Sequence, residues 1–352
     1  MKETLKRLSK RYLIDAMGAM ALGLFASLLI GTIFKALGMI PGLSVFTKIS
    51  EDALKVAGPA MAVAIAYSLK ASPLVIYTCA FVGWLANNNG GAGGPLAVLI
   101  IAIIAAEVGM LVSKKTKVDI LVTPFVTLLV GGLLSVWGAP YIGKLASLVG
   151  KLIDLAMTAQ PFVMGIVVAV VIGMALTLPI SSAAICTALL LSGAGEFGTP
   201  GLALAGGAAV AGCCAQMVGF AVMSFKENKW GGLVSQGIGT SMLQMPNIIR
   251  NPRIWLPTIL ASAITGPLAT CVFRMQMYGA PVNSGMGTCG LLGPIGLILG
   301  WFDPGYPEQV TALDWIGLLL ICFVLPAVLS LLFAWILRKI GWIKEGDLTL
   351  PE

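Results

Sequence analysis

Polar side chains gather between Gln216 and Asn251 of a sequence that is otherwise rich in apolar residues. Residues 230–249 carry no charged side chain, yet they hold several amides and hydroxyls, and Pro246 interrupts them. Amides and hydroxyls both donate and accept hydrogen bonds, which is the chemistry that a neutral polyhydroxylated ligand needs. A strongly anionic ligand would favour a cluster of buried arginines or lysines, which is lacking. The stretch therefore predicts a re-entrant element that lines a wet cavity.

Two glycine-rich segments interrupt long apolar runs. They read NNNGGAGGP at Asn87–Pro95, inside the charge-free run 71–106, and NSGMGTCGLLGP at Asn283–Pro294. Each glycine costs about 0.8–1 kcal/mol relative to alanine in a helix interior, so we expect no ordinary helix through either centre. Non-helical backbone at membrane depth persists only where protein or a water-filled cavity covers it. Such broken segments point to a transport site.

A third interruption, LPISSA at residues 178–183, places two hydroxyls beside a proline. Ser181 and Ser182 could satisfy backbone groups freed by Pro179, or they could face a ligand. For any single small polar residue, joining helices is the alternative to binding a solute. The residues predicted to line a solute site are Asn88, Ser181, Ser182, Gln216, Glu227, Asn228, Thr240, Ser241, Gln244, Asn247 and Thr288.

Two further carboxylates could couple transport to protons, because ionisable groups at membrane depth are costly and mark ion pathways. Glu107 could instead lie near the interface and face the basic turn SKKTK at 113–117. Glu196 could be a loop residue at the membrane surface or a substrate carboxylate. A proton-coupled secondary transporter, with Glu107, Glu196 or Glu227 titrating, is therefore one alternative function.

Several residue types that catalysis requires are missing. The chain has no histidine, which excludes histidine bases, histidine metal ligands and phosphohistidine on this chain. The phosphate-binding pattern G-x-x-x-x-G-K-[ST] is also absent, and all seven cysteines lie inside apolar runs. We therefore expect no catalytic residue, no metal site and no cofactor, and we favour a permease over an intramembrane enzyme.

The elements that must position these side chains are membrane helices. Of 352 residues, 58% are hydrophobic and 11% are charged, whereas a soluble domain carries about 25% charged residues. Since a spanning helix needs about 17–25 apolar residues, the charge-free runs predict roughly eight to ten membrane-embedded segments. The expected fold class is an all-α polytopic membrane protein with re-entrant hairpins.

The net charge of +7 does not indicate nucleic-acid binding. The basic residues cluster at segment ends, and lysine and arginine mark cytoplasmic ends. Those near the two ends of the chain are Lys2, Lys6, Arg7, Lys10, Arg11, Arg338, Lys339 and Lys344. Both termini are therefore predicted to be cytoplasmic, which implies an even number of crossings.

Residues 141–154 divide the chain. Their apolar residues recur at helical spacing, with Lys144 and Lys151 elsewhere, which predicts an amphipathic linker helix at the interface between two halves of the chain. We interpret residues 1–352 as one membrane-embedded domain, with an N-terminal half at 1–140 and a C-terminal half at 155–352.

Five segments carry a family resemblance, namely KTKVDILVTP (115–124), LPISSAA (178–184), GCCAQMVGFAVMS (212–224), GTSMLQMPNIIRNPRIWLP (239–257) and GMGTCGLLG (285–293). The chain resembles the EIIC-type permeases of the bacterial phosphotransferase system, and more narrowly their single-domain, toxin-regulator-like branch. The resemblance implies an EIIC-like fold with re-entrant hairpins, a homodimer and a place in the inner membrane. It also implies inward transport of a sugar, with separate EIIA and EIIB proteins supplying phosphate.

The chain departs from the well-studied sugar permeases of this system, which use a histidine and a G-I-T-E-P-like glutamate beside the sugar. It has neither, and it also lacks an EIIB-type phosphocysteine motif, so sugar phosphotransferase activity would require separate proteins. The leading hypothesis is a permease for a small neutral polar solute, with a sugar as the first candidate. A membrane ligand sensor that regulates gene expression through a partner is the other alternative.

Overall fold

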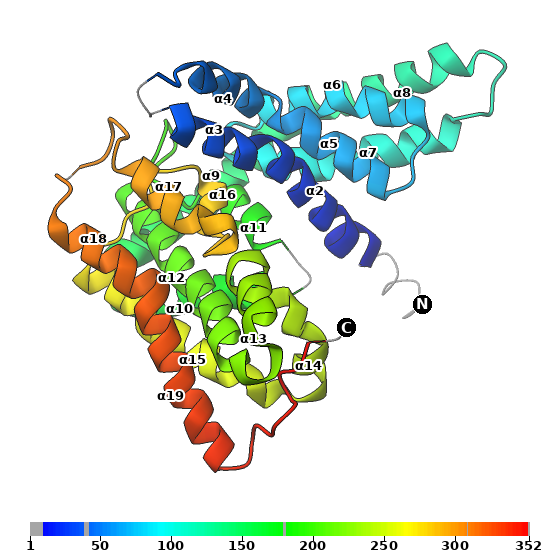
Figure 1. Cartoon of the computed structure of the whole chain (residues 1–352). Helices are drawn as coiled ribbons and strands as arrows, with labels where there is room; N and C mark the ends of the chain where they lie inside the picture. Colours follow the sequence, from blue (N-terminus) through cyan, green and yellow to red (C-terminus); the bar gives the residue numbers. More distant parts are fainter. Residues whose placement is uncertain (1–9, 39–41, 179–180, 308, 351–352) are drawn as a thin grey trace. The chain divides into compact units, whose positions relative to one another are not determined.

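The structure of the protein is a computed structural model that describes residues 10–38, 42–178, 181–307 and 309–350. Within these ranges all regular secondary structure is helical (Figure 1). Lys2, Lys6, Arg7 and Pro179, which the sequence analysis used, lie outside the described residues.

Among the described residues, six helices are long and apolar enough to cross a membrane. They are Lys10–Lys35, Gly94–Val112, Asp119–Ala159, Pro200–Met223, Pro252–Val272 and Ala312–Lys339. Shorter apolar helices are found at Ala57–Ser68, Pro161–Thr177 and Cys289–Gly300. The predicted all-helical membrane architecture is confirmed. Apolar runs of the sequence that do not form a membrane-length helix contain shorter helices instead.

The chain forms two compact units. The first comprises Met1–Gly150 with Thr187–Leu189, and the second comprises Lys151–Cys186 with Leu190–Glu352. Helix α9 (Ala139–Ala159) contains the predicted linker 141–154 and passes from the first unit into the second. The interpretation of 141–154 as an interfacial helix between two halves stays a prediction.

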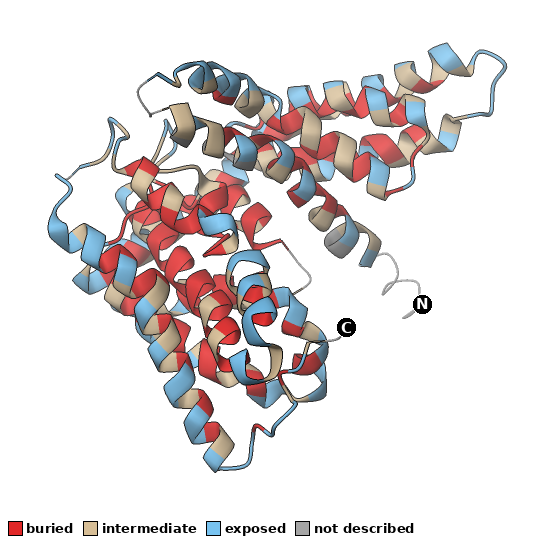
Figure 2. Ribbon diagram, in the orientation of Figure 1, coloured by how far each residue is buried: buried red, intermediate tan, exposed pale blue. Residues whose placement is uncertain are grey.

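The first unit is built around a group of closely packed helices. Its helices before α9 are α2 (Ala16–Leu24), α3 (Ile30–Gly38), α4 (Val45–Lys55), α5 (Ala57–Ser68), α6 (Pro73–Asn89), α7 (Gly94–Val112) and α8 (Asp119–Leu133). Helices α5 and α6 approach closely at Gly58, where a Cβ atom would lie 2.6 Å from the Gly83 carbonyl oxygen. Small residues allow such close backbone approach in membrane helices, and the facing surfaces are buried (Figure 2).

The first glycine-rich segment is a tight turn between α6 and α7. Helix α6 continues through Asn87, Asn88 and Asn89, so the interruption is shorter than the sequence predicted. The chain then passes through a 3₁₀ turn at Gly91–Gly93, where Gly91 has a φ of 49°. Asparagine costs less than glycine in a helix, and the helix therefore ends at the glycines.

The second unit surrounds one deeply buried helix. Its helices after α9 are α10 (Pro161–Thr177), most of α11 (Ser182–Ala188), α12 (Pro200–Met223), α13 (Phe225–Val234), α14 (Met245–Arg250), α15 (Leu256–Pro267), α16 (Pro281–Ser284), α17 (Leu292–Gly300), α18 (Ala312–Leu319) and α19 (Leu325–Lys339). Helix α12 packs against α10, α15 and α19 and is buried along most of its length (Figure 2). A Cβ atom on Gly212 would overlap the Ala169 carbonyl of α10.

Candidate functional site

The second glycine-rich segment is a buried interruption within the second unit. Helix α16 ends at Ser284, turns follow, and α17 begins at Leu292. Every residue from Val282 to Thr288 is buried. Gly287 has a φ of 52°, and a Cβ atom on it would lie 2.8 Å from the Cys213 Cβ atom of α12. Glycine is needed here both for the backbone conformation and for the close approach to α12.

Asn283 lies in this interruption and is fully buried, with neither its amide nitrogen nor its amide oxygen hydrogen-bonded within the described protein. Thr288 is 1% exposed, and its hydroxyl also has no hydrogen-bond partner within the described protein. An unpaired buried polar group costs about 1–3 kcal/mol. These two side chains are therefore available to donate and accept hydrogen bonds with a polar molecule. The sequence analysis selected Thr288 and missed Asn283, although Asn283 opens the predicted interruption.

The third interruption meets the second one. The Ser182 hydroxyl donates to the Gly285 carbonyl over 2.6 Å, between segments about one hundred residues apart in sequence. The Ser181 hydroxyl accepts from the Ala184 backbone N–H over 3.0 Å. Both serines are buried, and both hold local backbone in place at the buried segment.

Gln216 lies where α10, α12 and α15 pack together, and both its amide oxygen and its amide nitrogen are hydrogen-bonded there. Its side-chain oxygen accepts from the Thr258 hydroxyl over 2.8 Å and from the Trp255 indole N–H over 2.9 Å. Its amide nitrogen donates to the Ser262 hydroxyl over 3.3 Å. These bonds agree with the helix-joining alternative, and a solute-binding role for Gln216 stays a prediction. Ser241, also buried, shares a 2.9 Å hydrogen bond with a hydroxyl of α10.

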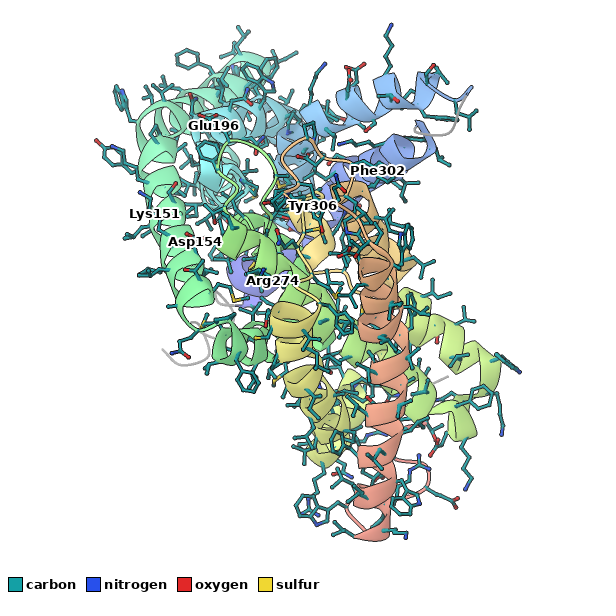
Figure 3. All side chains as sticks on the ribbon, turned by 90° about the vertical axis from the view of Figure 1, so that its left-hand side faces the viewer. Lys151, Asp154, Glu196, Arg274, Phe302 and Tyr306 are labelled. Carbon is teal, nitrogen blue, oxygen red and sulfur yellow. The ribbon has the colours of Figure 1, made fainter. Side chains whose placement is uncertain are left out.

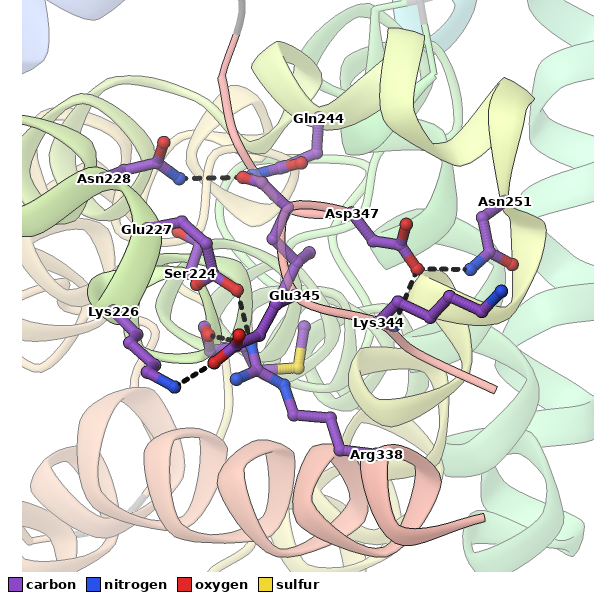
Figure 4. A network of polar contacts seen from close by, with 12 residues as sticks. Ser224, Lys226, Glu227, Asn228, Gln244, Asn251, Arg338, Lys344, Glu345 and Asp347 are labelled. Atoms are coloured by element: carbon purple, nitrogen blue, oxygen red, sulfur yellow. Dashed lines mark hydrogen bonds and ion pairs between the residues drawn. The ribbon is translucent and has the colours of Figure 1, made fainter. Parts of the chain in front are cut away.

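Three other predicted residues contact the C-terminal segment of the chain instead of an open cavity (Figure 4). The Asn228 amide donates to the Leu348 carbonyl over 2.8 Å. The Gln244 amide donates to the same carbonyl over 2.9 Å. The Asn247 amide donates to the Thr349 carbonyl over 2.8 Å. The structure thus brings these three amides together, and they bind protein backbone.

Glu227 belongs to the same region but forms an ion pair. Its side chain is 8% exposed, and one carboxylate oxygen lies 2.9 Å from the Arg338 guanidinium. Nearby, Lys226 forms an exposed ion pair with Glu345, and its hydrogen bond lowers the pKa of the Glu345 carboxyl below the ordinary value. The ion pair involves one carboxylate oxygen, whereas Oε2 is buried without a partner among the described residues, and a solute-binding role for Glu227 stays a prediction.

Four predicted residues lie elsewhere. Asn88 is exposed near the end of α6 in the first unit. The Thr240 hydroxyl accepts from the Met242 backbone N–H over 3.2 Å, at the start of a short 3₁₀ helix. Glu196 is exposed on the loop before α12 (Figure 3). Glu107 accepts from the Arg11 guanidinium over 2.6 Å, so its partner is Arg11 of the first unit rather than the basic turn that follows it.

The first unit also carries an apolar groove of about 610 Å³. Its lining residues are Pro59, Ala80, Phe81, Trp84, Leu85, Leu128 and Gly132. None of the predicted polar residues lines it, and its chemistry does not suit a polyhydroxylated ligand.

Comparison with known proteins identifies the family. No curated protein and no solved structure matches the chain. The family model described as "Phosphotransferase system, EIIC" matches residues 14–350, which is nearly the whole chain and includes every segment that carried the resemblance. The match agrees with the all-helical architecture and the six membrane-length helices. The chain therefore belongs to the EIIC family of the phosphotransferase system, a family of multi-pass membrane transporters.

Proposed function

We propose that this EIIC transporter binds and moves a small neutral polar solute, and that the solute is a sugar. The observation that carries the proposal is the buried interruption at residues 282–288, in which Asn283 and Thr288 present unpaired polar atoms. A sugar hydroxyl donates one hydrogen bond and accepts others, so adjacent hydroxyls can satisfy an amide and an alcohol together.

The buried polar groups of the protein favour a neutral solute. Apart from the ion pair of Glu227 with Arg338, in which opposite charges meet, the buried polar side chains of the described residues are serine, threonine, asparagine and glutamine. A buried charged solute would need an opposite charge to offset its lost hydration. Neutral amides and hydroxyls supply hydrogen bonds without that requirement.

The partners follow from the family. We propose that separate EIIA and EIIB proteins supply phosphate to the transported sugar, and that the chain acts as a homodimer in a bacterial inner membrane with both ends cytoplasmic. EIIC membership supports the membrane and the phosphocarrier partners. The narrower toxin-regulator-like branch, and solute contacts by the other predicted residues, stay predictions.

Uptake into proteoliposomes tests the proposal. Purified protein would be reconstituted and given labelled neutral sugars, with sugar phosphates and amino acids as charged comparisons. We expect saturable uptake of at least one neutral sugar, and reduced uptake by Thr288→Val. Saturable binding without flux would favour the sensor alternative, and neither binding nor flux of any neutral polar solute would overturn the proposal.

A further inference from the structure

The C-terminal segment of the described chain lies against the polar region around Asn228 and Gln244. That region precedes the segment in sequence by about one hundred residues. Helix α19 ends at Lys339, and Gly341 has a φ of 80°. The segment Trp342–Leu350, which we call the tail, then runs toward α13 and α14 (Figure 1). It has no regular secondary structure of its own beyond turns.

Side-chain amides bind the tail through its backbone. Asn228 donates to the Leu348 carbonyl over 2.8 Å and accepts from the Leu350 N–H over 2.9 Å, so one amide satisfies both kinds of backbone group. Gln244 and Asn247 donate to consecutive tail carbonyls over 2.9 and 2.8 Å. We call these three residues the amide cradle, and Figure 4 shows two of them, Asn228 and Gln244. The cradle recognises backbone groups that every extended peptide offers.

One leucine anchors the tail. Leu348 is fully buried, and it packs in a cluster with Phe220, Ile248 and Ile254. Ile343, at the start of the tail, is 2% exposed and belongs to the same cluster. Between these two anchors, Asn251 donates to the Asp347 carboxylate over 2.8 Å. The binding region therefore combines backbone recognition with an apolar pocket, as peptide-binding sites do.

Strained backbone adjoins the cradle. Lys229, next to Asn228, has φ 51° and ψ −150°, a conformation that residues other than glycine rarely adopt. Such strain persists only where surrounding contacts hold it in place. The bonds from Asn228 to the tail are among those contacts, so loss of the tail would allow the segment around Lys229 to relax.

We propose that the amide cradle and the apolar cluster around Leu348 form a peptide-binding site whose ligand, a peptide that bends through turns and carries a leucine anchor, is the chain's own tail. Occupancy of the site holds residues 225–251 in their strained conformation. The three cradle residues are also among those predicted to line a solute site, but this proposal rests only on their contacts with protein groups.

Hydrogen exchange of the full chain in lipid nanodiscs tests the proposal through Leu348→Asp. The matched control is Thr349→Asp, because the Thr349 side chain is exposed and only its carbonyl contacts the cradle. In Leu348→Asp we expect exchange in the tail and in residues 225–251 to rise about tenfold or more, with α10, α12 and α15 unchanged. The control is expected to resemble the wild-type chain.

A synthetic peptide with the sequence of residues 342–350 provides the second arm. We expect this peptide, added to the Leu348→Asp protein, to restore slow exchange in residues 225–251. A peptide that itself carries the Leu348→Asp change is not expected to restore it. If Leu348→Asp fails to fold, Asn228→Asp, which loses the donor to Leu348, takes its place. Exchange that rises equally in α12, an unchanged 225–251 segment, or a peptide that restores nothing would each overturn the proposal.

Discussion

At the scale of single residues, the buried side-chain amides of this protein differ in whether other protein groups form hydrogen bonds with them. Gln216 has hydrogen bonds to its side-chain oxygen and to its nitrogen, whereas Asn283 has a partner for neither. Both are fully buried. Replacing a polar group whose partners remain is costly, whereas replacing an unpaired one with an apolar group of similar shape is nearly neutral or stabilising. We therefore expect substitution of Gln216 to lower the stability of the protein, and substitution of Asn283 to weaken solute binding without lowering stability.

The substitution Asn283→Leu is expected to leave thermal stability unchanged or slightly higher, and to weaken solute binding at least tenfold, which corresponds to about 1.4 kcal/mol. Gln216→Leu is the comparison, and it is expected to destabilise the protein by about 1–3 kcal/mol, because it leaves the indole N–H of the half-buried Trp255 without its acceptor. Unfolding in detergent and equilibrium binding of a labelled solute measure the two effects. Strong destabilisation by Asn283→Leu would show that the amide has a structural role instead.

The Glu227–Arg338 ion pair is the most buried one described, with side chains 8% and 27% exposed. Arg338→Leu leaves the Glu227 carboxylate without its partner, and we expect a loss of about 3 kcal/mol in unfolding free energy. Adding Glu227→Gln should recover much of this loss. Lys226→Leu is the control, because that lysine and its partner are largely exposed, and it should change stability little. Equal effects of the two single substitutions would contradict this explanation.

At the scale of helices, sequence patterns located the interruptions better than they located the contacts. The glycines at 283–294 predicted a break because they weaken a helix, and a buried break is present. The prediction that the first interruption begins at the asparagines 87–89 was wrong, because they lie inside the last turn of α6. The tail could not be anticipated, since its bonds to Asn228 and Gln244 join segments more than one hundred residues apart and no local pattern marks such pairs.

Helix packing around α12 depends on the absence of a side chain at Gly212. Gly212→Ala places a methyl group where the Ala169 carbonyl lies, and we expect it to destabilise the protein by about 1–3 kcal/mol through overpacking. Gly231→Ala is the matched control, because nothing lies within 4 Å of a Cβ atom there. Unfolding in detergent compares the two variants. A Gly212→Ala protein as stable as the control would mean that α10 and α12 can move apart without cost.

At the scale of the whole molecule, composition predicted the class of protein most securely. Low charge along the entire chain requires a membrane, and in lipid a helix satisfies its own backbone, so an all-helical fold follows. The identity of the solute does not follow in the same way. In the proposal it depends on Asn283 and Thr288, which have buried polar atoms without partners, and that is a property of three-dimensional packing.

The whole chain has no histidine and thus cannot carry a phosphohistidine, and we have proposed that separate proteins supply the phosphate for the solute. Proteoliposomes that contain this protein alone are expected to equilibrate a sugar across the membrane without modifying it. With EIIA and EIIB enclosed in the vesicles in their phosphorylated forms, each able to give up its phosphoryl group, we expect phosphorylated sugar to accumulate above the outside concentration, because the charged product cannot re-enter a site built from neutral groups. Omitting EIIB is the control and should abolish the accumulation. If sugar is phosphorylated by this chain alone, or if a pH gradient rather than the phosphocarriers drives accumulation, the coupling proposed here is wrong.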